Sequence, residues 1–275
     1  MVELFVGHVI TQLNMEDQKN NYKEVARQAR LKALELIFKA QTSHAGSNLS
    51  AIDIMTVLFD KTDLTKDEVV LSAGWKAAAW YYFLHKKGII SQEELNSFCK
   101  VGSKFIGLVE PVEGRWGLKF AGGSMGMGLA AGAGFALAKK FKNESGKVYV
   151  LESDGGLNVG MVWETALIAA QNKLDNLVLI VDLNGFQAMG ESESVLGLEP
   201  LRDKFTAFNW DVVVVDGHDF PQMEMALGAE NDRPLVIIAN TTKGKGVSFF
   251  ENDNLWHYAQ IKEDDYKKAM EELNA

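Results

Sequence analysis

The sequence predicts a doubly wound α/β domain in which a mostly parallel sheet is flanked by helices. Four short segments, VYVL, LVLIV, VVVV and LVIIA, are continuous apolar runs rich in valine, isoleucine and leucine. Such runs are typical of parallel strands that are covered on both faces of a sheet. Segments with the apolar spacing of helices lie before and between them, so strand and helix alternate along the chain. We therefore expect four or five parallel strands.

The expected helices are recognised by apolar residues that recur at helical spacing. The clearest covers residues 22–39, where Val25, Ala29 and Leu34 share one face and charged residues occupy the opposite face. A second covers residues 50–59, with Ser50 in the N-cap position and Asp53 three residues later, close to a capping box. Further helices are expected over residues 75–87, over residues 162–172, and in EDDYKKAMEEL near the C-terminus.

The chain of 275 residues is expected to form a single domain, residues 1–275. Hydrophobic residues make up 47% of it, and no internal repeat, low-complexity tract or linker rich in proline, glycine and serine divides it. Residues 1–21 are interpreted as an N-terminal extension, and residues from about 256 to 275 as a C-terminal tail.

Composition argues against several classes of partner. There are 28 Lys and Arg against 37 Asp and Glu, and the basic residues form no run longer than pairs, so neither nucleic acid nor a membrane is an expected partner. No apolar stretch is long enough to cross a bilayer, and the N-terminus lacks the basic flank and the cleavage site of a signal peptide. The single cysteine, Cys99, has no partner within the chain, which fits a reducing compartment. We expect a cytoplasmic protein.

Polar residues follow two of the predicted strands at the point where each strand ends. Asp154 comes directly after VYVLES, and Asn184 comes directly after LVLIVDL. A right-handed crossover brings the carboxyl ends of such strands to one edge of the sheet, where ligands of these folds bind. A carboxylate, an amide and the carbonyl of Phe186 offer oxygen ligands to Mg²⁺, which also takes oxygens from substrate phosphates. Gly155 and Gly156 would let the backbone approach those phosphates.

Turns are the alternative interpretation of these motifs. SDGG and DLNG, each taken alone, are more often turns than metal ligands, but their separation and their positions after two apolar strands favour the metal site. The glycine-rich GGSMGMG also fits a loose dinucleotide fingerprint. It does not follow a strong strand, and the acidic residue required after a second strand is missing, so NAD is not expected.

These motifs resemble the thiamine diphosphate signature, in which Gly-Asp-Gly is followed further along by an asparagine after a strand. Taken with the rest of the chain, the similarity is to the N-terminal segment of transketolases, and it covers roughly residues 22–260. The segments that carry it are SHAGSNLSAIDIMTVLF, GGSMGMGLAAGAGFALA, KLDNLVLIVDLNGFQAMG, AFNWDVVVVDGHD and TTKGKGVSFFEN, in the family's order. The resemblance implies the PP-type thiamine diphosphate-binding fold, with thiamine diphosphate and Mg²⁺ as cofactors.

Carried over residue by residue, the resemblance implies Mg²⁺ ligation by Asp154, Asn184 and the Phe186 carbonyl, and diphosphate contact from the Gly155 amide. It implies that the cofactor and substrate site is lined by His44, Ser124, Met125, Gly126 and His257. His44 could instead be a loop histidine satisfied by backbone groups, but HAGS lies outside any apolar periodicity, which favours function. His44 and His257 are the candidate catalytic residues.

Three positions depart from the family pattern. Trp75 stands where transketolases usually have the histidine of Ser-x-Gly-His, and Leu108 stands where they have the histidine of Gly-His-Pro. Val159 replaces a glutamate that helps to link the two cofactor sites of the family's dimer. Two groups that could bond sugar hydroxyls or relay protons are thus replaced by apolar ones, and we expect a substrate other than the usual sugar phosphates.

The family's complete enzyme has a second domain, which grips the aminopyrimidine ring and supplies a glutamate that promotes ylide formation. The chain ends at Ala275, before such a domain. The resemblance therefore implies a separate C-terminal-half subunit, an α2β2 assembly through a homodimer of this chain, and transfer of a two-carbon ketol unit between a ketose and an aldose. Two alternatives stay open. One is a thiamine-dependent lyase or acyl transferase acting on a 2-oxo acid or a modified sugar, and the other is a noncatalytic subunit that regulates or scaffolds.

Overall fold

The computed structural model describes the backbone of residues 2–275 and the side chains of residues 21–275. A five-stranded sheet, in the order β1-β2-β3-β7-β6, runs through the molecule, and each neighbouring pair in it is parallel. Its strands are β1 (Glu68–Leu71), β2 (Val148–Ser153), β3 (Leu177–Leu183), β6 (Asp211–Asp216) and β7 (Leu235–Asn240). The predicted parallel α/β fold is confirmed.

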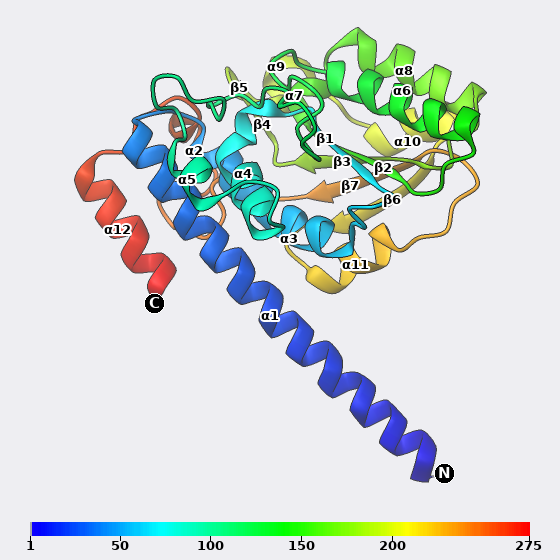
Figure 1. Cartoon of the computed structure of the whole chain (residues 1–275), viewed down its shortest axis with the longest axis horizontal. Helices are drawn as coiled ribbons and strands as arrows, with labels where there is room; N and C mark the ends of the chain where they lie inside the picture. Colours follow the sequence, from blue (N-terminus) through cyan, green and yellow to red (C-terminus); the bar gives the residue numbers. More distant parts are fainter. Residues whose placement is uncertain (1) are drawn as a thin grey trace.

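Helices cover both faces of this sheet (Figure 1). One face carries α1 (Val2–Ala40), α3 (Ile52–Lys61), α4 (Ala77–Lys86) and α11 (Phe220–Leu227), and the other carries α6 (Met127–Lys142), α8 (Gly160–Gln171) and α10 (Leu201–Ala207). The remaining elements are α2 (Ala45–Ser50), η1 (Gly74–Lys76), α5 (Gln92–Asn96), α7 (Asp154–Leu157), β4 (Phe186–Gln187), β5 (Gly190–Glu191), α9 (Ser192–Leu196), η2 (Asn254–His257) and α12 (Glu263–Asn274).

The core divides into two clusters of buried apolar side chains, one on each face of the sheet. Alternate residues of each strand point to opposite faces, so Tyr149 and Leu151 of β2 belong to one cluster and Val148 and Val150 to the other. The central strands are therefore apolar at nearly every position, which explains why the sequence shows continuous apolar runs.

Both ends of the chain differ in part from the expected boundaries. Helix α1 covers Val2–Ala40, whereas the apolar spacing predicted a helix only over residues 22–39. The proposed N-terminal extension, residues 1–21, falls almost entirely outside the residues whose side chains are described. The proposed C-terminal tail contains α12, which lies against α1, and the rings of Phe38 and Tyr266 stack with centroids 4.1 Å apart.

The predicted cap of the second helix was wrong. Helix α3 begins at Ile52 after Ala51, which offers no side-chain cap, and Ser50 is the last residue of α2. The Ser50 hydroxyl donates instead to Asp182 on β3, at 2.6 Å, and Asp53 forms an ion pair with Arg30, also at 2.6 Å. Both side chains are used in tertiary contacts, which overrode the local capping pattern.

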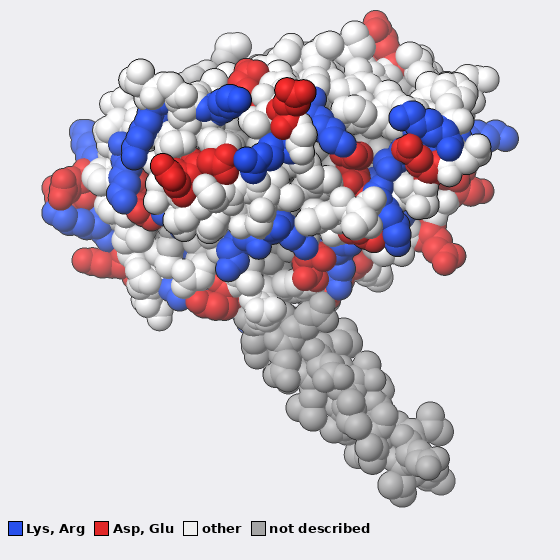
Figure 2. All heavy atoms as spheres, in the orientation of Figure 1, with Lys and Arg blue, Asp and Glu red and all other residues white. Residues whose placement is uncertain are grey.

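The surface carries charges of both signs. On the face shown in Figure 2, basic and acidic side chains are interspersed among the described residues. This distribution does not suggest a surface for a polyanion on that face. As far as the described residues extend, no helix has both the length and the apolar character required to cross a membrane.

The close approach of α6 to β2 depends on a glycine. A Cβ atom added at Gly132 would lie 2.3 Å from Cγ2 of Val150, whereas at Gly134 on the same helix it would meet nothing within 4 Å. We predict that Gly132→Ala lowers the free energy of unfolding by about 1–3 kcal/mol, because the helix must shift away from the strand. The matched control Gly134→Ala should raise it by about 0.5–1 kcal/mol. Urea unfolding followed by circular dichroism measures both, and equal changes would contradict the packing argument.

Candidate functional site

A cavity of about 320 Å³ opens at the carboxyl edge of the sheet. Ligands of doubly wound folds bind at this edge. The cavity is lined by His44, Ser47, Trp75, Gly123, Met125, Ser153, Gly155, Asn184, Phe186, Gln187, Ala188, Met189, His257 and Tyr258. The structure thus gathers residues from six separate segments of the chain, including both candidate catalytic histidines.

Asp154 directly follows β2 as the first residue of α7, and its carboxylate is held in one orientation. Its Oδ2 atom accepts hydrogen bonds from the Gly185 amide at 2.8 Å and the Ser192 hydroxyl at 3.0 Å. Its Oδ1 atom is buried and has no partner among the described residues. Burial, and after it the nearby charge of Asp182, raises the pKa of Asp154 to about 7. A buried carboxylate oxygen without a partner is costly, and a cation bound to it would remove that cost.

Asn184 lies beside Asp154, because the turn that follows it is bound to that carboxylate through Gly185. The Asn184 amide nitrogen donates to Asp182 at 3.3 Å, and its Oδ1 atom accepts from the Phe186 amide at 3.1 Å. No group of three His, Cys, Asp or Glu side chains suited to a metal ion occurs in the described part of the chain. A metal here would therefore depend on one carboxylate, an amide or carbonyl oxygen, and oxygens of the cofactor, which is how Mg²⁺ is commonly held.

Two histidines form one wall of the cavity. His44 has φ +73°, an unusual value for a residue other than glycine, and its amide donates to the His257 carbonyl at 3.0 Å. The two rings meet edge to face, with centroids 4.9 Å apart. Burial, followed by the charges of nearby lysines, lowers the pKa of His44 to about 4 and that of His257 to about 3. Both imidazoles are therefore neutral at neutral pH.

Lys243 fixes the tautomer of His257. Its ammonium group lies 3.2 Å from Nδ1 of His257 and also donates to the side-chain oxygen of Asn254. An ammonium group can only donate, so Nδ1 accepts and the remaining proton sits on Nε2. His257 therefore offers an N–H donor through Nε2.

Sequence reasoning missed a group of buried charged side chains next to this cavity. Lys76, Glu152, Asp182 and Lys243 are each 0% exposed. Lys76 lies 2.5 Å from Asp182, and both are fully buried. A signal was present for Asp182, because it interrupts the apolar run LVLIVDL, and for Lys76, because it precedes an apolar helix without a charged neighbour.

Some predicted residues lie near the cavity without lining it. Gly156 packs over Glu152, where an added Cβ would lie 2.2 Å from the carboxylate, so glycine is needed there for packing. Gly126 has φ +73°, and an added Cβ would lie 2.8 Å from Val159. Ser124 is exposed. Their predicted contacts with a cofactor stay predictions.

The positions that depart from the family pattern also gather here. Trp75 lines the cavity, and Leu108 lies close to the lining residue Gly123, where an added Cβ would be 3.5 Å from the leucine side chain. The third, Val159, contacts Gly126 as described above. The apolar replacements therefore border the site rather than a distant surface.

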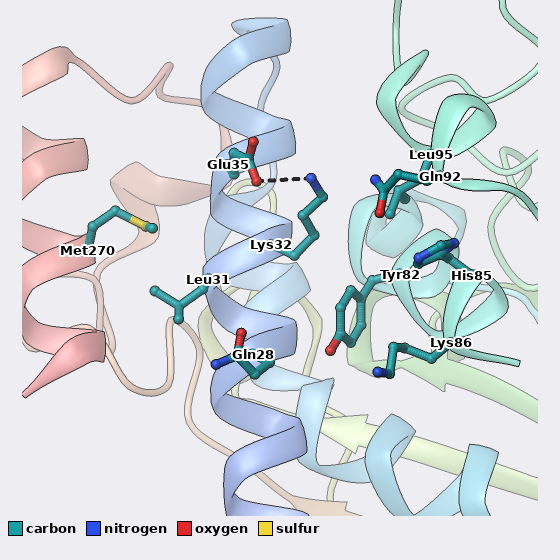
Figure 3. A pocket seen from close by; sticks show the side chains of 10 residues that line it. All are labelled: Gln28, Leu31, Lys32, Glu35, Tyr82, His85, Lys86, Gln92, Leu95 and Met270. Carbon is teal, nitrogen blue, oxygen red and sulfur yellow. Dashed lines mark hydrogen bonds and ion pairs between the residues drawn. The ribbon is translucent and has the colours of Figure 1, made fainter.

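A second cavity of about 510 Å³ lies between α1, α4, α5 and α12 (Figure 3). Lys32 and Glu35 of α1 form an ion pair at 3.0 Å in this cavity, while Tyr82 and His85 of α4 face them. None of its lining residues belongs to the cavity at the carboxyl edge. The convergent buried charges are at the carboxyl edge, which makes that edge the candidate functional site.

The raised pKa of Asp154 predicts a pH-dependent stability. The pKa of Asp154 is about 7 in the folded chain and about 3.9 in an unfolded one. The free energy of unfolding therefore decreases as pH rises from about 4 to about 7, because the folded chain resists ionisation of this carboxyl. In metal-free solution Asp154→Asn should raise the unfolding temperature by several degrees at pH 8 and by much less at pH 5. Thermal unfolding in EDTA at both pH values measures this, and Mg²⁺ added together with inorganic diphosphate should stabilise only the unmodified chain. An Asp154→Asn variant destabilised at pH 8 would contradict the assignment.

Comparison with known proteins places this chain in a family. Residues 21–274 match the model described as transketolase, thiamine diphosphate binding domain. The chain is 35% identical to one of the subunits of an apulose-4-phosphate transketolase from Phocaeicola vulgatus, over 95% of this chain and 94% of that one. It is 31% identical to a 6-deoxy-6-sulfo-D-fructose transketolase subunit from Clostridium sp., over 94% and 98% of the two chains.

A solved structure agrees with these matches. Transketolase from Campylobacter jejuni superimposes with a TM-score of 0.85 at 32% identity, covering 92% of this chain and 42% of that one. The match thus spans less than half of the complete transketolase chain. The chain therefore belongs to the transketolase family, which it matches over the thiamine diphosphate binding domain.

Proposed function

We propose that the chain binds thiamine diphosphate through Mg²⁺ and is one subunit of a transketolase that transfers a two-carbon ketol unit from a ketose to an aldose. The observation that carries the proposal is the buried Oδ1 atom of Asp154, which has no partner within the described part of the chain and lies beside Asn184 at the cavity. Asp154, Asn184 and the Phe186 carbonyl would hold the metal ion, and the Gly155 amide would contact the diphosphate.

The residues of this chain have separate roles in that reaction. When bound, thiamine diphosphate supplies the carbanion chemistry by which the ketol unit is detached and re-attached. His257 can donate a hydrogen bond from Nε2 to a substrate oxygen, because Lys243 occupies Nδ1. His44 and His257 are neutral at neutral pH, so they act as hydrogen-bonding groups rather than as cations. Trp75 and Met125 give the cavity part of its apolar lining.

A second chain would complete the site. Relatives that this chain covers almost entirely are named as subunits, and complete transketolases are more than twice as long as the matched segment. We propose a partner subunit that holds the aminopyrimidine ring, in an α2β2 assembly built on a homodimer of this chain. We also propose that residues 1–275 form a single domain and that the enzyme works in the cytoplasm, which suits the free thiol of Cys99.

The metal assignment predicts the effect of removing its ligands. Asp154→Ala should abolish Mg²⁺-dependent binding of thiamine diphosphate, because a methyl group cannot replace a carboxylate on a divalent cation. Asn184→Ala should weaken binding. Calorimetric titration with Mg²⁺ and thiamine diphosphate measures both, with and without the partner subunit. Asp216→Ala, which alters an exposed aspartate at the end of β6, is the matched control. If Asp154→Ala bound thiamine diphosphate and Mg²⁺ with unchanged affinity, the metal assignment would be wrong.

The apolar residues at the site predict its specificity. Trp75 and Leu108 leave fewer groups to bond the hydroxyls of a sugar phosphate, and each buried hydroxyl left unpaired costs about 1 kcal/mol or more. With the partner present, xylulose 5-phosphate and ribose 5-phosphate should therefore react at least about tenfold more slowly than a deoxy or otherwise modified sugar. The names of the relatives, which refer to apulose 4-phosphate and a sulfodeoxy sugar, support this expectation.

The assay has two controls. The chain without its partner should show no ketol transfer, and turnover by the isolated chain would refute the two-subunit proposal. The double variant Trp75→His/Leu108→His should improve the rate with pentose phosphates relative to the modified sugar. Fast turnover of pentose phosphates by the unmodified pair would overturn the specificity argument and leave the cofactor assignment standing. Reaction only with 2-oxo acids would indicate a lyase or acyl transferase.

A further inference from the structure

Lys76 has no part in the function proposed above, yet it lies buried beside the candidate metal site. Its ammonium group is 2.5 Å from Oδ2 of Asp182 and 3.0 Å from the Ser47 carbonyl. Asp182 in turn binds the amide of the predicted ligand Asn184. A fully buried ion pair costs several kcal/mol of desolvation per ion, so it contributes little net stability. Because the ion pair lies beside this cavity, Lys76 can set the net charge that a bound ion meets there.

The charge of Lys76 acts on the groups around the cavity as well as on Asp182. Burial is the largest cause of the pKa shifts here, but Lys76 opposes the raised pKa of Asp154 and Glu152. It also helps to lower the pKa of Lys243 and, with Lys243, that of His44. The electric field of this one ammonium group therefore reaches both the predicted metal ligand and the histidine wall.

The buried charged side chains around the cavity form one negative pair and one positive pair, which favour ions of opposite sign. Asp154 and Asp182 are two neighbouring carboxylates, and together they would attract a divalent cation without any cofactor. Lys76 and Lys243 are two buried ammonium groups, and together they would attract a diphosphate. Because Lys76 is paired with Asp182, Asp154 is the only carboxylate of the two that is left free for the cation.

We propose that Lys76 is a positioning residue that makes metal and cofactor bind together: by cancelling the charge of Asp182 it prevents tight binding of a divalent cation alone, so the cation is held only with a diphosphate. The proposal rests on the proposed function and adds the mode of loading. The Lys76 ammonium group repels a cation and attracts an anion, so the same charge that weakens binding of the bare cation strengthens binding of the diphosphate. A site of this kind excludes unproductive occupation by a free cation.

A double-mutant cycle at Lys76 and Asp182, made in the full chain, tests the proposal. The probes are Mn²⁺ alone, followed by electron paramagnetic resonance, and inorganic diphosphate alone in EDTA, followed by calorimetry, both at pH 7.5, where Asp154 and Lys243 are both mostly charged. The unmodified chain should bind Mn²⁺ alone with a Kd weaker than about 1 mM. Lys76→Met should tighten Mn²⁺ about tenfold and weaken diphosphate about tenfold, and Asp182→Asn should do the opposite. The double variant Lys76→Met/Asp182→Asn, which restores the charge balance, should return both affinities to within about threefold of the unmodified chain.

Controls separate this role from a structural one. Lys76→Arg keeps the charge and should keep both affinities, and Lys139→Met removes a buried ammonium group elsewhere, at the end of α6, and should change neither. Changes of the same sign for both probes in the single variants would show a structural role and overturn the proposal. If the single variants fail to fold, the unmodified chain decides, because micromolar binding of Mn²⁺ alone would refute it. Titration of the unmodified chain with Mg²⁺ and thiamine diphosphate tests the proposed function separately.

Discussion

Asp182 is the group on which the geometry of the candidate site depends. It sits in β3 with no exposed surface and accepts hydrogen bonds from Ser50, Lys76, Asn184 and Thr241. These donors come from α2, from η1, from the turn after β3 and from the segment after β7, so one carboxylate ties four parts of the chain to the carboxyl edge. Burial disfavours its charge, but Lys76 and the hydrogen bonds outweigh burial and hold the pKa of Asp182 below its usual value. Replacing one partner would leave a buried charge uncompensated, which costs far more than an exposed pair is worth.

A second buried network holds the opposite side of the same segment. His218 accepts from the Thr242 amide through Nε2 at 2.8 Å, so its Nδ1 carries the proton and donates to Asp53 at 2.7 Å. Asp53 also binds Arg30 of α1. The two residues before Lys243 are thus both held, because Thr241 binds Asp182 and the Thr242 amide binds His218. This placement sets the position of the Lys243 ammonium group, which in turn orients the ring of His257.

The sequence was informative where local pattern and tertiary structure agree. Continuous apolar runs predicted the parallel strands, because those strands are buried on both faces, and the ends of two such runs located Asp154 and Asn184. Ser50 shows the limit of the approach, since its spacing to Asp53 fits a capping box although both side chains bind partners that are distant in sequence. Lys76 shows it more strongly. A lysine next to an apolar helix has no local pattern that reveals its partner 106 positions away. Networks of buried charge are set by topology, so they could not be predicted from spacing.

The site has two parts, a charged floor formed by the buried residues Lys76, Asp154, Asp182 and Lys243, and an apolar rim around the opening of the cavity. The two parts suit different ligands. The buried lysines and aspartates lie near the carboxyl ends of strands, and their charges suit the metal ion and the diphosphate that we propose as ligands. The rim is formed by residues such as Met125, Met189 and Tyr258, which are 41%, 80% and 62% exposed. Apolar side chains that stay this exposed around a cavity are suited to being covered. The proposed partner subunit would cover them, so that substrate would be recognised between the two chains while the charged floor of this chain stays unchanged. On this proposal, residues near the rim such as Trp75 and Leu108 would alter the sugar that is accepted without disturbing the charges proposed to hold the cofactor.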